Sequence, residues 1–114
     1  MENVIIRFAN TGVAEANRFA ESLRSAILDV APDAQVRQRK ETQEAMDFGA
    51  TLGIILAGPA VVAIAKGVQA WLERHHGVEI EIVTSEGKVI AKNVTANNAV
   101  DILKRAEITL RKQP

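Results

Sequence analysis

Few side chains in this sequence have the types and spacing that catalysis or metal binding requires. His75 and His76 are the two histidines of the chain, and there is no cysteine. Adjacent residues on a helix point about 100° apart, so these imidazoles cannot face one metal ion as a pair spaced four residues apart would. Ser and Thr occur without a His and an acid placed to activate them. We therefore predict no enzyme activity, no catalytic residues, no bound metal and no cofactor.

Two carboxylates and a pair of glycines suggest other sites, but their surroundings favour simpler roles. Glu79 and Glu81 fall on one face of a predicted strand, and Lys92 is expected opposite Glu81 across a hairpin. This arrangement indicates an exposed sheet face and not a pair of catalytic carboxylates. Gly49-x-x-x-Gly53 lacks the Gly-Lys-Ser/Thr ending of a phosphate-binding loop, so we predict no nucleotide site there.

Basic residues cluster at Arg37-Gln38-Arg39-Lys40, directly before Glu41. Two interpretations are open: a solvated strand edge, or a surface that contacts an acidic partner. Across the whole chain, 14 basic and 14 acidic residues give a formal net charge of zero, which provides no overall field to attract nucleic acid. Aromatic residues make up only 4%, so side chains that could stack on bases are few. We expect no nucleic-acid partner.

Length and composition indicate one globular unit. The 114 residues, 47% hydrophobic and 25% charged, fit a single domain over residues 1–114. The lack of cysteine excludes a disulfide framework, and the first residues have neither the basic region nor the apolar segment of a signal peptide. We expect a cytoplasmic protein.

The first 41 residues predict a strand, a helix and a second strand. Residues 4–8 alternate, with apolar side chains on one face. Apolar residues recur at steps of three and four from Val13 to Val30, which predicts an amphipathic helix that stops at Pro32. The polar stretch 35–41 is predicted as an edge strand because it lies between two helical segments.

A long helix is predicted from about Gln43 to His75-His76, kinked or divided at Gly58-Pro59. It contains 18 uncharged residues, Phe48 to Ala65, which meets the lower length limit of a transmembrane helix. The apolar residues favour insertion by about 2–5 kcal/mol in total, but Pro and Gly offset most of this gain. A buried helix of a soluble core is the favoured interpretation, and a membrane-associated segment is the alternative.

Small residues recur along this predicted helix at steps of three and four, so that one face carries no side chain larger than a methyl group. Such a flat face allows another backbone to approach closely. One interpretation is packing against the protein's own sheet or first helix, and the other is a seam for docking or self-association. Trp71, the single Trp, is interpreted as a core anchor or as part of a binding surface. The face consists of Gly49, Gly53, Ala57, Ala60, Ala63, Gly67 and Ala70.

The last third predicts a β-hairpin and a helix. Residues 78–83 and 89–94 alternate on either side of a turn at Glu86-Gly87, a register that pairs Glu81 with Lys92. An apolar stripe from Ala99 to Leu110 predicts the final helix. The order is strand, helix, strand, long helix, strand, strand, helix, which predicts a small α/β domain with helices covering a sheet of about four strands.

One stretch also resembles a known family. From Leu52 to about Ala106 the chain has a Gly/Ala-rich apolar helix, Trp71-Leu72 before a basic helix end, an alternating strand, a Glu86-Gly87-Lys88 turn, a second strand and a helix. This pattern resembles the effector-associated constant component of bacterial NTP-dependent conflict systems. Members of that family tend to carry more Arg where this chain has His75-His76, and Pro59 interrupts the long helix.

The resemblance implies a non-catalytic component encoded beside protease or NTPase effectors, which it would link or restrain; no catalytic residues carry over. We therefore predict a protein-interaction module, adaptor or regulatory, in a bacterial defence system. The alternative is a membrane-associated protein that uses the uncharged helix 48–65 for insertion or oligomerisation, and homo-oligomer formation stays open. The predicted interaction residues are Gly49, Gly53, Ala57, Ala60, Ala63, Gly67, Trp71, Glu79, Glu81 and Lys92.

Overall fold

The computed structural model describes residues 2–40 and 50–111, which form five strands and three helices. In chain order these are β1 (Val4–Phe8), α1 (Val13–Val30), β2 (Val36–Lys40), β3 (Ala50–Ile54), α2 (Ala60–Arg74), β4 (Ile80–Thr84), β5 (Val89–Val94) and α3 (Ala99–Arg111). The predicted small α/β domain is confirmed, and its sheet has five strands, one more than expected.

The strands form one antiparallel sheet in the order β2-β3-β1-β4-β5, with β1 at its centre. Its first four strands, with α1 and α2, follow the β-α-β-β-α-β order of ferredoxin-like folds: a strand of one βαβ unit lies between the two strands of the other. β5 and α3 extend this unit. Because a fold of this kind serves many functions, it does not by itself indicate one.

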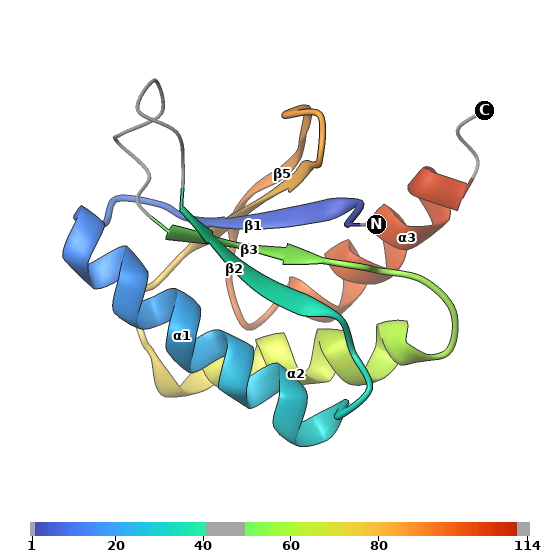
Figure 1. Cartoon of the computed structure of the whole chain (residues 1–114), viewed down its shortest axis with the longest axis horizontal. Helices are drawn as coiled ribbons and strands as arrows, with labels where there is room; N and C mark the ends of the chain where they lie inside the picture. Colours follow the sequence, from blue (N-terminus) through green and yellow to red (C-terminus); the bar gives the residue numbers. More distant parts are fainter. Residues whose placement is uncertain (1, 41–49, 112–114) are drawn as a thin grey trace.

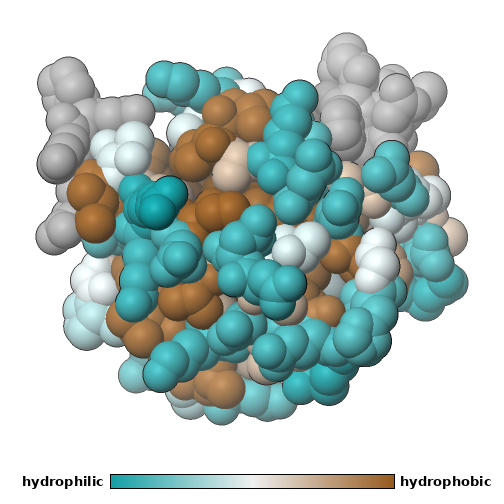
Figure 2. Space-filling model, turned by 180° about the vertical axis from the view of Figure 1, so that it is seen from behind, coloured by the Kyte–Doolittle hydropathy of each residue, from teal (hydrophilic) through white to brown (hydrophobic). Residues whose placement is uncertain are grey.

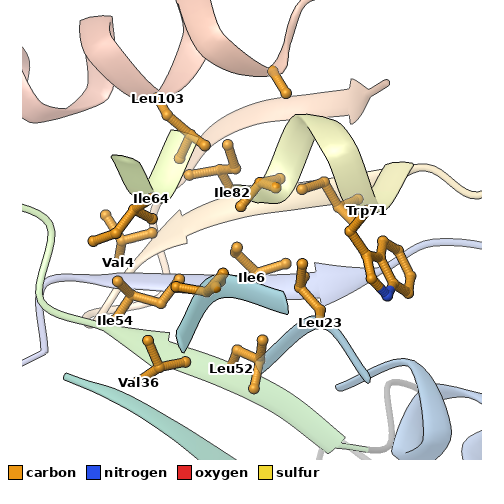
Figure 3. Packing of buried hydrophobic residues seen from close by; sticks show 14 of the residues in the cluster. Val4, Ile6, Leu23, Val36, Leu52, Ile54, Ile64, Trp71, Ile82 and Leu103 are labelled. Carbon is orange, nitrogen blue, oxygen red and sulfur yellow. The ribbon is translucent and has the colours of Figure 1, made fainter. Parts of the chain in front are cut away.

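The helices α1 and α2 lie below the sheet in Figure 1, and α2 contacts both α1 and α3. Alternate strand residues such as Ile6, Leu52 and Ile82 point toward them and are fully buried. Leu23 of α1 and Leu103 of α3 close the same core (Figure 3). The opposite face of the sheet has no helix packed on it in the part of the chain described.

The predicted long helix is wrong over residues 50–54, which form β3. All five residues of β3 are buried, because the strand lies between β1 and β2. A strand buried on both faces has no polar alternation, so its sequence looks like that of a buried helix. Gly58 has a φ of +69° and α2 begins only at Ala60, so Gly58-Pro59 separates a strand from a helix. The predicted start of the helix near Gln43 lies outside the described residues.

This division also removes the premise of the membrane-segment alternative, which was a continuous helix over residues 48–65. Within residues 2–40 and 50–111, no helix has the length and apolar character needed to cross a membrane.

The predicted hairpin is present, with a modified register. Ile82 pairs with Ala91, but Ile80 pairs with Val94, so that Glu81 alone faces Lys92 and Asn93. Asn93 has a φ of +55°, as one residue of a bulge commonly does. The expected one-to-one pairing of Glu81 with Lys92 is therefore replaced by a β-bulge.

Candidate functional site

The small residues of the predicted seam do not share one helix face. Gly49 lies outside the described residues, Gly53 lies in β3, and Ala57 is exposed in the connection before α2. Only Ala60, Ala63 and Gly67 belong to α2 together with Ala70. The prediction of a continuous flat face is wrong because the segment changes from strand to helix at Gly58-Pro59.

Gly67 allows α2 to approach α1 closely. A Cβ atom at this position would lie 2.9 Å from Cγ2 of Val30 and 3.4 Å from Cα of Ile27. Ala60 and Ala63 are half-buried and pack against the core. At these positions the small residues serve packing within the chain, which is the first of the two interpretations that the sequence left open.

Trp71 is fully buried and anchors the end of α2 in the core (Figure 3). Its Nε1 donates a hydrogen bond to Oγ of Ser22 at 2.9 Å. Its ring centroid lies 6.0 Å from that of Phe8 and 5.5 Å from that of Phe19. His75 stacks on the indole at 4.1 Å, with an angle of 19° between the ring planes. Trp71 therefore has the position of a core anchor and offers no surface to a partner.

The charged residues of the predicted site are separated from α2. Glu81 lies opposite Arg7 in the register of β4 and β1, on the face of the sheet away from the helices. Lys92 is exposed in the bulge of β5, and Glu79 is half-buried just before β4. Glu79 borders two hollows of about 340 and 300 Å³ beside the connection from α2 to β4. These residues do not converge on one site.

Exposed apolar side chains do not mark a docking groove either. The large ones are spread over four elements, with the two on α1 at its opposite ends, and in Figure 2 the hydrophobic areas on the rear face are divided by hydrophilic side chains. The exposed residues are Val13, Val30, Val62, Val89 and Ile108. In residues 2–40 and 50–111, no group of three or more His, Cys, Asp or Glu side chains could hold a metal ion.

A polar site formed by several segments lies instead on the face of the sheet opposite the helices, which we call the open face. Arg37 and Arg39 are alternate residues of the edge strand β2, so their side chains point to the same face. Arg37 pairs across the sheet with Gly53 of β3, which in turn pairs with Ile5 of β1. The missing side chain of Gly53 leaves a space beside the two guanidinium groups.

The carboxylate of Glu2 fills this space. Its Oε1 accepts a hydrogen bond from Nη1 of Arg39 at 3.2 Å, and its Oε2 lies 3.9 Å from Nε of Arg37. A Cβ atom at Gly53 would overlap the carboxylate. The side chain of Glu2 is 16% exposed, whereas those of Arg37 and Arg39 are 81% and 47% exposed. We call the arrangement of Gly53, Arg37 and Arg39 around this group the carboxylate niche.

Asn3 holds Glu2 in place. The backbone N–H of Asn3 donates to the carbonyl of Ile54 at 3.2 Å. Its side-chain amide donates to the carbonyl of Leu56 at 3.2 Å and accepts from the N–H of Leu56 at 2.9 Å. These three hydrogen bonds fix the segment before β1 to the end of β3, which places Glu2 beside Gly53.

The niche opens into a shallow hollow of about 550 Å³. Among its described lining residues, two guanidinium groups face one carboxylate, which leaves a local excess of positive charge. The guanidinium groups bind carboxylates through charge-assisted, often bidentate hydrogen bonds. The site can therefore bind an acidic group of a ligand. The lining residues are Glu2, Gln35, Arg37, Gln38, Arg39, Ile55 and Ser85.

The sequence indicated part of this site. The sequence contains the basic cluster at residues 37–40, for which an acidic partner is one of two interpretations. It predicts Gly53 as part of a helix face, and it gives no indication of Glu2. Arginines at alternate positions of an edge strand were the available signal, because they must share a face. No local pattern shows that Glu2 contacts Arg39, which follows it by 37 residues in the sequence.

Comparison with known proteins gives no relative from which a function could be transferred: no family model, no curated protein and no solved structure matches the chain.

Proposed function

We propose that this chain is a non-catalytic protein-interaction module, adaptor or regulatory, that binds a partner through the open face of its sheet. The observation that carries the proposal is the carboxylate niche, in which the exposed Arg37 and Arg39 stand together beside Gly53. The resemblance to the effector-associated constant component supports a protease or NTPase effector as the partner, although its Gly/Ala-rich helix begins at Ala60 here and not at Leu52.

The chemistry of the niche suits a protein surface. Arg is enriched in protein interfaces, where its planar group combines charge with apolar contact area. Exposed charges at such a surface accelerate encounter with a partner of opposite charge and select against partners of like charge. The hollow is wide and open, and its lining residues come from four places: the segment before β1, β2 with the residue before it, the residue after β3, and the β4–β5 turn. A protein segment could contact several of these together, whereas a small ligand would be left largely in solvent.

Capture of partners encoded by neighbouring genes tests the proposal. The tagged chain is purified beside those proteins, together with the double variant R37E/R39E. The matched control is R18E/R105E, which reverses two exposed arginines on α1 and α3. We expect the wild type and the control to retain the same partner and R37E/R39E to lose it, while circular dichroism shows that all three proteins are folded.

Two results would overturn the proposal. One is a wild-type chain that captures none of the neighbouring proteins. The other is a partner retained equally by R37E/R39E and the control, since this would place the contact on another surface.

A further inference from the structure

We propose that Glu2 is an internal ligand of the carboxylate niche, and that an extended acidic segment of the partner displaces it. This inference rests on the proposed function and names the chemistry of the partner. It starts from the observation that the niche holds a carboxylate that is part of the chain itself, in contact with Arg37 and Arg39. A site shaped around one carboxylate can accept another.

Displacement of Glu2 should cost little. Its contact with Arg37 is 3.9 Å long, and both guanidinium groups are substantially exposed. The Glu2 side chain is only 16% exposed, but water and salt reach the arginine side of both ion pairs and screen them, so that these pairs contribute little to stability. An incoming carboxylate would form the same contacts and also approach the exposed side of Arg37. The exchange therefore preserves the interactions of the niche while it adds those of the rest of the ligand.

The spacing of the arginines defines the ligand. Arg37 and Arg39 are two residues apart in a strand, so their Cβ atoms lie roughly 7 Å apart on one face. An extended peptide repeats its side chains at the same distance. Asp or Glu at alternate positions would therefore present one carboxylate to each guanidinium group, whereas adjacent acidic residues would point to opposite sides of the peptide.

The free edge of β2 is partly blocked, which favours side-chain recognition over addition of a strand to the sheet. Ile55 donates its N–H to the carbonyl of Gln35, so the next carbonyl, that of Val36, points away from β3. Nε of Arg24 donates to this carbonyl at 3.0 Å. A peptide that paired with the edge would have to displace Arg24, while a peptide lying over the open face would not.

The test uses a fluorescent peptide of eight residues in which Glu alternates with Ser. The control peptide has the same composition with its four Glu residues contiguous. Binding is measured by fluorescence anisotropy for the wild type, E2Q, R37E/R39E and E86Q. The last variant removes one exposed negative charge beside Ser85, at the rim of the hollow, without emptying the niche. It therefore controls for a general change in charge.

We expect the alternating peptide to bind the wild type more tightly than the contiguous one. E2Q should raise the affinity by about two- to fivefold, because a neutral amide at position 2 binds the two guanidinium groups less strongly than the carboxylate does and is easier to displace. E86Q should change it less than twofold at physiological salt, where charges are screened over about 8 Å. R37E/R39E should abolish binding, and a single-stranded oligonucleotide of eight thymidines should not displace the peptide.

The outcomes separate this inference from the proposed function. Equal or weaker binding by E2Q would show that Glu2 is not a competitor, even if R37E/R39E still loses its protein partner. Binding of neither peptide, or displacement by the oligonucleotide, would overturn the acidic segment as ligand. Capture of the protein partner would then decide the proposed function by itself.

Discussion

One contact links the side chain of Glu2 to the position of Gly53. The Glu2 carboxylate occupies the space that a side chain at position 53 would take, and it pairs there with Arg39. The carboxylate is the far end of a flexible side chain, so a methyl group at position 53 can push it aside. Strain in the strand is then avoided at the expense of the ion pairs.

This coupling predicts that E2A and G53A are not additive. Each variant removes the same two ion pairs, whose arginine partners are exposed, so each loss should lower the free energy of unfolding by no more than about 1 kcal/mol. G53A also gains from replacing Gly within a strand, by about 0.5–1 kcal/mol. The double variant E2A/G53A should lose less than the sum of the two, with a coupling of roughly 0.5 kcal/mol. Urea unfolding followed by Trp71 fluorescence measures all four proteins.

Additive effects would contradict the contact between Glu2 and the niche. E15A provides the matched control, because Glu15 is an exposed carboxylate on α1 that does not line the niche. Its effect should add to that of G53A without coupling.

The packing of α2 against α1 explains why a small residue is needed at position 67. Gly67 brings α2 close to α1, and the nearest atoms include backbone of Ile27 and Ala26 as well as the side chain of Val30. Backbone of a packed helix cannot move aside as the Glu2 side chain can. Gly53 and Gly67 of the predicted seam therefore differ in what surrounds them, although their sequence context looks similar.

G67L should destabilise the protein by about 1–3 kcal/mol, because its side chain would overpack the contact between α1 and α2. K66L, at the exposed neighbouring position, is the control and should change the free energy of unfolding by less than about 0.5 kcal/mol. Urea unfolding compares both variants with the wild type. A G67L protein with wild-type stability and altered self-association would instead support a docking seam at this position.

A single hydrophobic core contains residues from both the first strand and the last helix of the molecule. The central strand β1 pairs with β3 and β4, which follow it by about 50 and 80 residues in the sequence. Leu103 of the last helix is fully buried in the same cluster as Trp71 and Ile6. The added β5 and α3 are therefore built into the core of the four-stranded unit.

Cooperative unfolding is the expected consequence, and it tests the prediction of a single domain over residues 1–114. L103A should lower the free energy of unfolding by about 2–5 kcal/mol, a large part of the 5–15 kcal/mol typical of a domain. Fluorescence of Trp71 and far-ultraviolet circular dichroism should give the same transition in the wild type and in L103A. Two separate transitions, with only one shifted by L103A, would show that α3 folds as a separate unit.

Elements that have one buried face can be recognised from the local order of their side chains. Residues 13–30 and 99–111 repeat apolar side chains with the period of a helix, and residues 80–84 alternate as a strand does. In each case the boundary between core and solvent is present in the local order of side chains. Residues 36–40 form the predicted edge strand, but that prediction rested on a position between two helical segments, and the next described element, β3, is a strand.

Long-range contacts, by contrast, are needed to define β3, which is buried on both sides, and the carboxylate niche, which several segments build together. Residues 50–54 have no solvent face, so nothing in their local order distinguishes a strand from a helix; their place between β1 and β2 does. The carboxylate niche joins Glu2, Arg37, Arg39 and Gly53, which come from three segments separated by many residues. Their contact depends on strand order and register, and those are set by long-range pairing.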